Sequence, residues 1–159
     1  MSIRIRNFRP GDEVLIAQLF KDSIRGLASQ VYSALQINAW AGRARTAEAW
    51  LALASDGRQT FVAVANDSDM AGFTNLEADG HVDHLFVAPD FARQGIAARL
   101  LDHLERHARL VDMPRLFTEA SAVARPVFER QGFVKLERRD FELDGVAIHN
   151  YAMEKSLAR

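Results

Sequence analysis

The sequence contains no cysteine. This absence excludes a disulfide framework, a cysteine-based metal site and a cysteine nucleophile, and it fits a reducing compartment, so we expect a cytoplasmic protein. Neither sign of charge is in excess, because 20 Lys and Arg residues stand against 21 Asp and Glu residues, for a formal net charge of −1. Such a composition offers no broad cationic surface to nucleic acid or to an anionic membrane, and we expect neither as a partner.

Long apolar runs are missing as well. The longest stretch without Asp, Glu, Lys or Arg extends from Gly26 to Gly42, and its Ser, Gln and Asn residues make it too polar for a membrane span of roughly 20 apolar residues. The first residues lack the apolar core of a signal peptide, and their alternation of polar and apolar side chains predicts a strand. With 159 residues, 48% of them hydrophobic, the chain predicts a single globular domain over residues 1–159.

Turn signals and hydrophobic spacing predict the order of the elements. Helices are predicted after the turn at residues 9–12, around residues 32–40, at residues 46–53, from about Arg93 to Pro114, and at residues 123–131. Further strands are predicted at residues 60–65, 70–76, 81–87, 116–118, 133–143 and 146–153. Short connections favour antiparallel hairpins, and the strand-helix-strand segment makes the sheet mixed. The pattern predicts an α/β fold (α+β), with a central, mostly antiparallel sheet flanked by helices.

The segment from His81 to Leu101 is the most informative about function, because it joins a strand through a turn to the long helix. Gly95, Ala97 and Ala98 are small, so an anionic group can approach the unpaired N–H groups at the helix N-terminus, where the helix dipole favours negative charge. Arg93 adds a cation at the same place. Neither a Walker lysine motif nor G-x-G-x-x-G occurs, so these residues predict a pyrophosphate site of another kind; the alternative is tight strand-helix packing without a ligand.

The neighbouring residues resemble the coenzyme A-binding motifs of the GNAT (GCN5-related) acyl-CoA N-acyltransferase family. Leu85-Phe86-Val87-Ala88-Pro89 and Arg93-Gln94-Gly95-Ile96-Ala97 resemble the pattern L-x-V-x-P followed by Q/R-x-x-G-x-G/A. Farther along, Ser121-Ala-Val-Ala124, Phe128-Glu129 and Gly132-Phe133 resemble N-x-x-A-x-x-x-Y-E-x-x-G-F. The two motifs stand in the family's order, and the predicted elements resemble the GNAT fold over nearly the whole chain.

The resemblance implies an acyl-CoA-dependent N-acyltransferase, in particular an N-acetyltransferase that moves an acetyl group from acetyl-CoA to a primary amine. Transfer would be direct, in a ternary complex, and no metal is implied. The acceptor would be a small-molecule amine or a peptide amine, and a homodimer stays open because dimers are common in the family. The residues that would bind the cofactor are Leu85, Phe86, Val87, Arg93, Gln94, Gly95, Ile96, Ala97, Ala98, Ser121 and Phe128.

The sequence departs from the family pattern at three positions. Ala92 stands at the first position of Q/R-x-x-G-x-G/A, where backbone N–H groups tolerate the change. Phe128 replaces the tyrosine that often protonates the departing thiolate, and Ser121 replaces the usual asparagine. The thiolate then leaves unassisted or through water, or Ser121 takes over part of the task. These departures motivate an alternative function: a catalytically weak GNAT-fold protein that binds coenzyme A or has a regulatory role.

A general base is required because an amine is mostly protonated at neutral pH and only its neutral form attacks a thioester. The family often places this base on the strand before the cofactor loop, where strand alternation puts His81, Asp83 and Leu85 on one face. Histidine suits the role of general base because its ordinary pKa lies close to neutral pH. Glu119 follows the neighbouring strand and is a further candidate for base or ammonium anchor. The alternatives are a solvated turn residue for His81, an ammonium anchor or a surface residue for Asp83, and a helix-start acid for Glu119.

Four residues are predicted to contact the acceptor. The resemblance places the helical region that contains Tyr32 and Trp40 over the acceptor site, although ordinary packing also explains these aromatic residues. His84, on the strand of the base candidates, and Tyr151, on the last strand, complete the set, and both residue types are also common in cores. The spacing of His103 and His107 can bind metal, but no third ligand is evident, so we expect no metal site.

Overall fold

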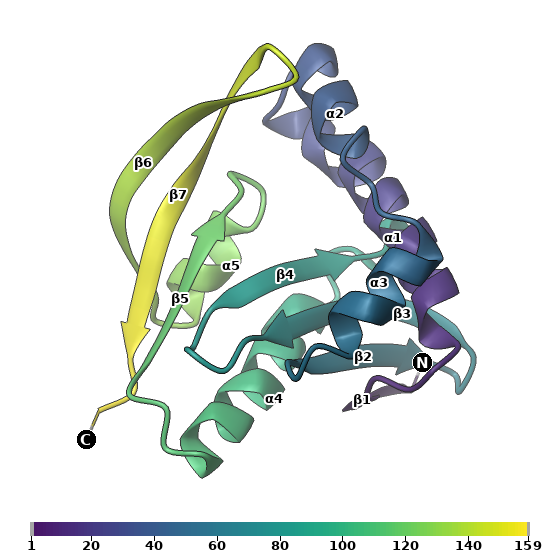
Figure 1. Cartoon of the computed structure of the whole chain (residues 1–159), viewed down its shortest axis with the longest axis vertical. Coiled ribbons are helices and arrows are strands. Elements are labelled where there is room, and N and C mark those ends of the chain that lie inside the picture. Colours follow the sequence, from purple (N-terminus) through teal and green to yellow (C-terminus); the bar gives the residue numbers. More distant parts are fainter. Residues whose placement is uncertain (1, 159) are drawn as a thin grey trace.

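The computed structural model describes residues 2–158 and contains two antiparallel sheets that diverge from each other (Figure 1). The first sheet has the order β1-β2-β3-β4. Its strands are β1 (Ile3–Asn7), β2 (Gln59–Ala65), β3 (Asp69–Leu76) and β4 (Val82–Val87). The second sheet has the order β5-β7-β6, with β5 (Arg115–Ala120), β7 (Val146–Ser156) and β6 (Val134–Leu143). All strand pairs within the two sheets are antiparallel.

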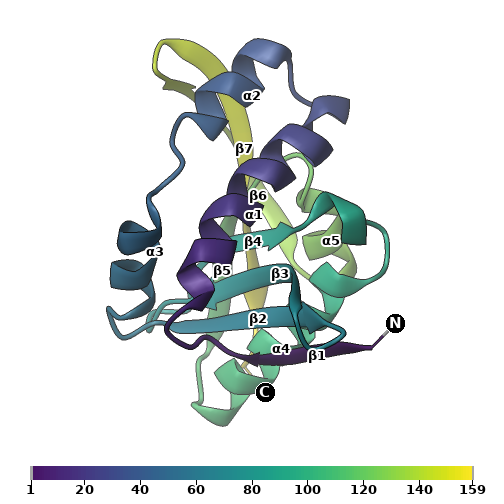
Figure 2. The same cartoon turned by 90° about the vertical axis from the view of Figure 1, so that its right-hand side faces the viewer.

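Helices cover both faces of the first sheet (Figure 1, Figure 2). The α-helices are α1 (Asp12–Leu27), α2 (Ala34–Ala41), α3 (Ala47–Ala54), α4 (Ile96–Leu110) and α5 (Arg125–Arg130), with short 3₁₀ turns η1 (Ala28–Gln30) and η2 (Pro89–Phe91). Side chains of β2 alternate between the faces. Phe61 and Ala63 pack with α4, whereas Val62 and Val64 pack with α1, so this strand is apolar on both sides. The predicted fold class is therefore confirmed.

The strands β4 and β5 lie side by side only at their beginnings. A parallel bridge joins His81 to Phe117, and the Thr118 hydroxyl donates to the Val82 carbonyl at 2.8 Å. Gly80 permits this approach, because its φ is +96° and a Cβ there would overlap the carbonyl oxygen of Arg115. Beyond the bridge the two strands separate (Figure 1). The predicted mixed sheet is thus realised as two antiparallel sheets with a single parallel contact.

A bulge in β4 accompanies the separation. Asn75 of β3 is opposite His84 and Leu76 is opposite Val82, which leaves Asp83 without a partner on β3. A bulge adds twist to a strand and re-aims the side chains beside it. The edge of β4 after Asp83 that faces β5 therefore stays unpaired within residues 2–158.

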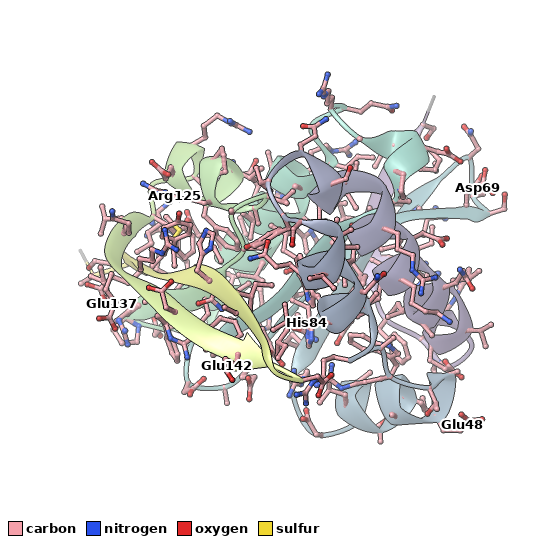
Figure 3. The ribbon with its side chains drawn as sticks, turned by 90° about the horizontal axis from the view of Figure 1, so that it is seen from above. Glu48, Asp69, His84, Arg125, Glu137 and Glu142 are labelled. Atoms are coloured by element: carbon pink, nitrogen blue, oxygen red, sulfur yellow. The ribbon has the colours of Figure 1, made fainter. Side chains whose placement is uncertain are left out.

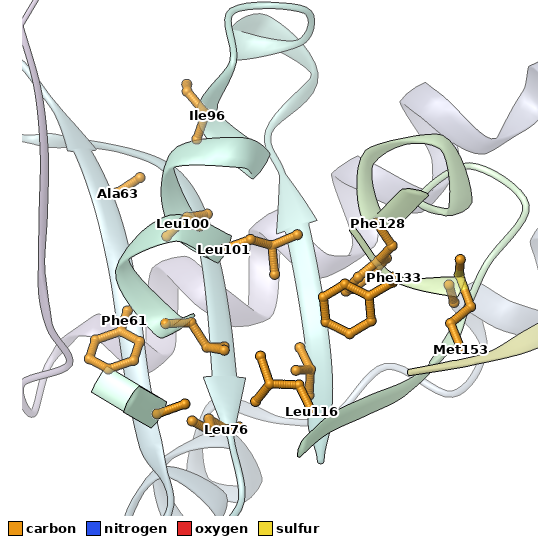
Figure 4. Packing of buried hydrophobic residues seen from close by; sticks show 14 of the residues in the cluster. Phe61, Ala63, Leu76, Ile96, Leu100, Leu101, Leu116, Phe128, Phe133 and Met153 are labelled. Atoms are coloured by element: carbon orange, nitrogen blue, oxygen red, sulfur yellow. The ribbon is translucent and has the colours of Figure 1, made fainter. Parts of the chain in front are cut away.

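One apolar cluster holds the two sheets together below the separation (Figure 4). Leu100 and Leu101 of α4 belong to the same cluster as Phe128 of α5 and Phe133, which directly precedes β6. Met153 of β7 extends the cluster into the second sheet. At the opposite end, α2 reaches the β6–β7 hairpin (Figure 1), where Gln36 Nε2 donates to the carbonyl of Ala147 at 3.0 Å. A cavity lined by residues of both sheets lies between these two contacts.

The predicted start of the long helix was wrong by three residues. The helix α4 begins at Ile96 rather than near Arg93, because Arg93 and Gly95 adopt positive φ values of 62° and 75°, which a right-handed helix does not permit. The other predicted helices and strands are present, with boundaries shifted by a few residues and with β7 reaching Ser156. No helix within residues 2–158 combines the length and apolar character that crossing a membrane requires.

Candidate active site

A groove of about 340 Å³ lies beside the loop that precedes α4, and we call it the loop groove. Its lining includes Val87, Arg93, Gly95, Ile96, Ala97, Ala98 and Val127, with Ile24 and Leu27 from α1. Within residues 2–158, the backbone N–H groups of residues 93–98 donate no hydrogen bond. Free donors at a helix N-terminus, together with the Arg93 guanidinium, make the groove receptive to an anion.

The backbone of the loop is shaped for close approach. The left-handed conformations of Arg93 and Gly95 bend the chain so that neighbouring N–H groups can converge on one anion. A Cβ built at Gly95 would meet nothing within 4 Å, which means that open space lies directly over this residue. A ligand can therefore reach the backbone at this position.

A second cavity of about 460 Å³ fills the space between the diverging sheets, and we call it the central cleft. Its apolar and aromatic lining includes Phe20, Tyr32, Trp40, Phe86, Phe141, Leu143 and Ile148. Besides Tyr32, its ionisable lining consists of Arg43, Arg45, Asp83, His84, Glu119 and His149. Seen from above, His84 lies between the β6–β7 hairpin and the N-terminal helices (Figure 3).

The loop groove and the central cleft share part of their lining, which we call the junction. The shared residues are Trp40, Leu85, Phe86, Ser121 and Ala124. Leu85 and Phe86 belong to the part of β4 whose edge is unpaired, and Ser121 directly follows β5. Two ligands, one in each cavity, would therefore meet where β4 and β5 separate.

Most residues predicted from the sequence line one of the two cavities. In the loop groove or at the junction lie Leu85, Phe86, Val87, Arg93, Gly95, Ile96, Ala97, Ala98 and Ser121. In the central cleft lie Tyr32, Trp40, Asp83, His84, Glu119 and Phe128. His81, Gln94 and Tyr151 line neither cavity. Consecutive residues from Asp83 to Phe86 line the cleft, because its wall is a bulged and unpaired strand edge rather than one face of a flat sheet.

His81 does not line the cleft and is held between the carboxylates of Glu77 and Glu119. Its Nε2 lies 2.8 Å from Oε1 of Glu119 and its Nδ1 lies 2.7 Å from Oε1 of Glu77. The hydrogen bond to Glu119, helped by the one to Glu77, raises the pKa of His81 to about 9 against the opposing effect of burial. An imidazolium with this pKa keeps its proton at neutral pH, so His81 is poorly suited to take one from an amine.

The hydrogen bonds of His81 to Glu77 and Glu119, which we call the His81 clamp, predict that the stability of the protein depends on pH. Because the folded pKa lies above the ordinary value of 6.5, the clamp stabilises fully below pH 6.5 and is lost as pH rises through about 9. We expect the free energy of unfolding to fall by roughly 2 kcal/mol between pH 6.5 and 9.5, after allowance for solvent screening. Urea unfolding at both pH values measures the fall. In His81→Gln the free energy of unfolding should fall less between the two pH values. An equal fall in the variant and the unmodified protein would contradict this role of the clamp.

Asp83 is paired with a buried arginine that sequence patterns did not reveal. The side chain of Arg58 is only 6% exposed, and its Nη1 donates to Oδ2 of Asp83 at 2.8 Å. Its Nη2 also bonds Asp56 at 2.9 Å and lies 3.7 Å from Glu77. One ligand atom each of Glu77, His81 and Asp83 lies within 4.8 Å of the others, but the guanidinium already occupies this acidic cluster. The expectation of no metal stays a prediction.

His84 and Tyr32 are tied into the structure by their polar atoms. Burial lowers the pKa of His84 to about 4, so its ring is neutral at physiological pH. The Tyr32 hydroxyl donates to the carbonyl of His149 at 2.9 Å and accepts from the N–H of Ala122 at 2.8 Å. Tyr32 therefore connects the N-terminal helices to β7 and to the segment after β5. Its ring, rather than its hydroxyl, is available to the cleft.

Ser121 and Phe128 occupy different environments near the junction. Ser121 Oγ accepts a hydrogen bond from the N–H of Ala124 at 3.1 Å, which leaves the hydroxyl proton available to another acceptor. Phe128 is 2% exposed and packs edge-on against Phe133, with ring centroids 5.0 Å apart. Of these two residues, only Ser121 carries a proton that a thiolate could receive.

Several lining residues were missed by the sequence patterns. They are Arg43, Arg45, Phe141, Leu143, Ile148, His149 and Asn150. Arg43 and Arg45 are the first charged residues after the uncharged stretch from Gly26 to Gly42, and this position next to the predicted acceptor region was an available signal. The others come from the β6–β7 hairpin and reach the cleft only through the fold.

Comparison with known proteins agrees with this arrangement. Residues 28–155 match the family model described as "Acetyltransferase (GNAT) domain". The chain is 34% identical over 154 residues to "Uncharacterized N-acetyltransferase YafP" of Escherichia coli (strain K12), across 96% of this chain and 95% of that protein. A GCN5-related N-acetyltransferase from Rhodopseudomonas palustris is 30% identical, with a TM-score of 0.89 over 99% of this chain and 97% of that one. YncA from Salmonella typhimurium, solved with its cofactor acetyl-CoA, shares the fold at 16% identity, with a TM-score of 0.79 over 100% and 96% of the chains.

The diverging strands, the free N–H groups at the start of α4 and these relatives define the class of protein: it is an N-acetyltransferase. More particularly, the chain belongs to the GNAT family of acetyltransferases. The family resemblance read from the two sequence motifs is thereby confirmed.

Proposed function

We propose that the protein transfers an acetyl group from acetyl-CoA directly to a primary amine in a ternary complex. The observation that carries this proposal is the junction, where Leu85, Phe86 and Ser121 line both the loop groove and the central cleft. A donor in the groove and an acceptor in the cleft would have their reacting ends at the same place. We take residues 1–159 as one such domain, and the cysteine-free composition fits the cytoplasm as its location.

The cofactor would bind through backbone groups more than through side-chain charge. The free N–H groups of residues 93–98 and the Arg93 guanidinium would hold the pyrophosphate. The pantetheine arm would lie along the unpaired edge of Leu85 to Val87, as an added strand does. A backbone N–H of Leu85 or Phe86 would then stabilise the negative charge that develops on the thioester oxygen.

Glu119 is the group best placed to receive the amine proton. It lines the cleft from β5, two residues before Ser121 at the junction. Its Oε1 accepts from His81, which fixes the carboxylate and leaves Oε2 available to the amine. Asp83 also lines the cleft, but its Oδ2 is approached by two groups, the buried Arg58 guanidinium at 2.8 Å and Nδ1 of His84 at 3.5 Å. We therefore assign the proton transfer to Glu119, with His81 as its positioning residue.

The departing thiolate would be assisted by Ser121 or by water. Phe128 offers no hydroxyl, whereas Ser121 lies at the junction with a proton to donate. The missing tyrosine also supports a second candidate function, a protein that binds acetyl-CoA with weak or no turnover.

Thiol release in the presence of a panel of amines and peptides separates the two candidate functions. The reaction requires one free coenzyme A thiol for each amide formed, and mass spectrometry detects the acetylated product. Acceptor-dependent release supports the transferase. Binding of acetyl-CoA by calorimetry without release for any acceptor would support the second candidate instead.

A further inference from the structure

The central cleft carries charged groups of both signs, which come from different elements of its wall. Asp83 and Glu119 come from β4 and β5, whereas Arg43 and Arg45 come from the segment between α2 and α3. Three of these four groups have a partner of opposite charge: Asp83 pairs with Arg58 at 2.8 Å, Glu119 with the His81 imidazolium at 2.8 Å, and Arg43 with Asp144 at 3.2 Å. The fourth group, Arg45, therefore determines which charge the cleft can offer to a ligand.

Arg45 has no carboxylate within 4.0 Å among residues 2–158. Its Nη1 instead lies 3.3 Å from Nε2 of His84, and its Cζ lies 5.1 Å from the centre of the Trp50 ring. An arginine can only donate, so Nε2 of His84 is the acceptor and the ring proton is on Nδ1. Because burial keeps His84 neutral, this hydrogen bond orients the guanidinium without cancelling its charge.

His84 is itself firmly positioned for this task. Its backbone N–H donates to Oδ1 of Asn75 at 3.0 Å, and its carbonyl accepts from the hydroxyl of Thr74 at 2.7 Å. Its Nδ1 lies 3.3 Å from Oδ1 of Asn75 and 3.5 Å from Oδ2 of Asp83. The two nitrogens of one ring thus face a carboxylate on one side and the Arg45 guanidinium on the other. Asp83 is already paired with Arg58, so of the two groups beside the His84 ring only Arg45 keeps a charge for a ligand.

We infer that the acceptor is an amino carboxylate: an amine that also carries a carboxylate, on an apolar or aromatic body. The ammonium end would face Glu119 and the junction, the carboxylate would bind the planar donor fork of Arg45, and the body would contact the aromatic lining at Trp40 and Phe86. This inference rests on the proposed acetyl transfer and names its substrate class. His84 acts through Arg45 and is a positioning residue.

Matched acceptors test the inference directly. L-Phenylalanine and L-leucine are each compared with their amides and with the corresponding decarboxylated amines, at saturating acetyl-CoA, by thiol release. We expect kcat/KM to be about 10- to 50-fold higher for the free acids, because the amides and the decarboxylated amines lack the charge-assisted hydrogen bond to Arg45. Equal or better rates for the amides, or acetylation only of amines without an anionic group, would overturn it.

The variant Arg45→Gln locates the effect. It should raise KM for the free acids about 10- to 50-fold with little change in kcat, leave the amides unaffected, and be partly rescued by Arg45→Lys. Arg4→Gln, on the far edge strand β1 and paired with Asp67, is the control for loss of one positive charge. Unchanged discrimination between acid and amide in Arg45→Gln would contradict the inference.

Binding provides a readout that does not need turnover. Calorimetry of the same acid and amide pairs is performed on the protein saturated with coenzyme A. If the protein binds the acids more tightly than the amides, and Arg45→Gln loses this preference, the inference is supported even where no thiol is released. Binding thus distinguishes a failure of the proposed acetyl transfer from a failure of the inference. Absence of preferential binding by any acid overturns the inference, even if another amine is acetylated.

Discussion

Gly95→Glu is expected to weaken the binding of acetyl-CoA at least 100-fold. Gly95 has open space over its Cα and borders the free N–H groups of residues 93–98, so the new carboxylate would occupy the place proposed for the pyrophosphate. It would satisfy the helix N-terminus itself and repel the anionic ligand. Calorimetric titration with acetyl-CoA measures the loss.

Gly11→Glu is the matched control for this variant. Gly11 also precedes a helix, has a φ of +109° and has no atom within 4 Å of a built Cβ. Both substitutions therefore impose the strain of a side chain at positive φ, but only one lies in the loop groove. We expect Gly11→Glu to bind acetyl-CoA like the unmodified protein. Binding by Gly95→Glu with unchanged affinity would refute the proposed pyrophosphate site.

Glu119→Gln is expected to lower kcat about 100-fold, the size of a general-base contribution, without changing the affinity for acetyl-CoA. Glutamine keeps the size of the side chain and an oxygen acceptor for His81, but it cannot take a proton. Steady-state thiol release with the acceptor identified by the panel gives kcat, and calorimetry gives the cofactor affinity.

Two further variants show whether the loss comes from proton transfer. Glu77→Gln removes the other carboxylate that holds His81, at 2.7 Å, but Glu77 lies outside the cleft. Its kcat should change only a few-fold, so an equal loss in Glu77→Gln and Glu119→Gln would assign the effect to the His81 clamp. A large loss in Asp83→Asn together with near-normal activity in Glu119→Gln would move the base to Asp83.

The loop groove could be predicted from the sequence because its groups are contiguous. The free N–H donors, Arg93 and Gly95 lie within one segment, and the features that matter there are small side chains and a helix start. The predicted start of α4 was wrong, because positive φ values at Arg93 and Gly95 hold the loop out of the helix, and of the predicted cofactor residues Gln94 and Phe128 do not line the groove. Local chemistry of this kind is visible in linear order.

The central cleft could be predicted only in part because its charges are assembled by the fold. Arg58 reaches Asp83 across 25 residues, and Arg45 reaches His84 across 39. The bulge at Asp83 also breaks the simple alternation that placed His81 and Asp83 together, and His81, which does not line the cleft, bonds Glu77 and Glu119. Neither the partners nor the raised pKa of His81 follows from local spacing.

Initial rates with both substrates varied test the central claim most directly. In the proposed transfer at the junction acetyl-CoA and the amine are bound together, and the absence of cysteine excludes an acetyl-cysteine intermediate. Double-reciprocal plots of thiol release should therefore give intersecting lines, with no stoichiometric release in the absence of an amine. Parallel lines, accompanied by a burst of thiol without acceptor, would show an acetylated enzyme and contradict direct transfer between the two cavities.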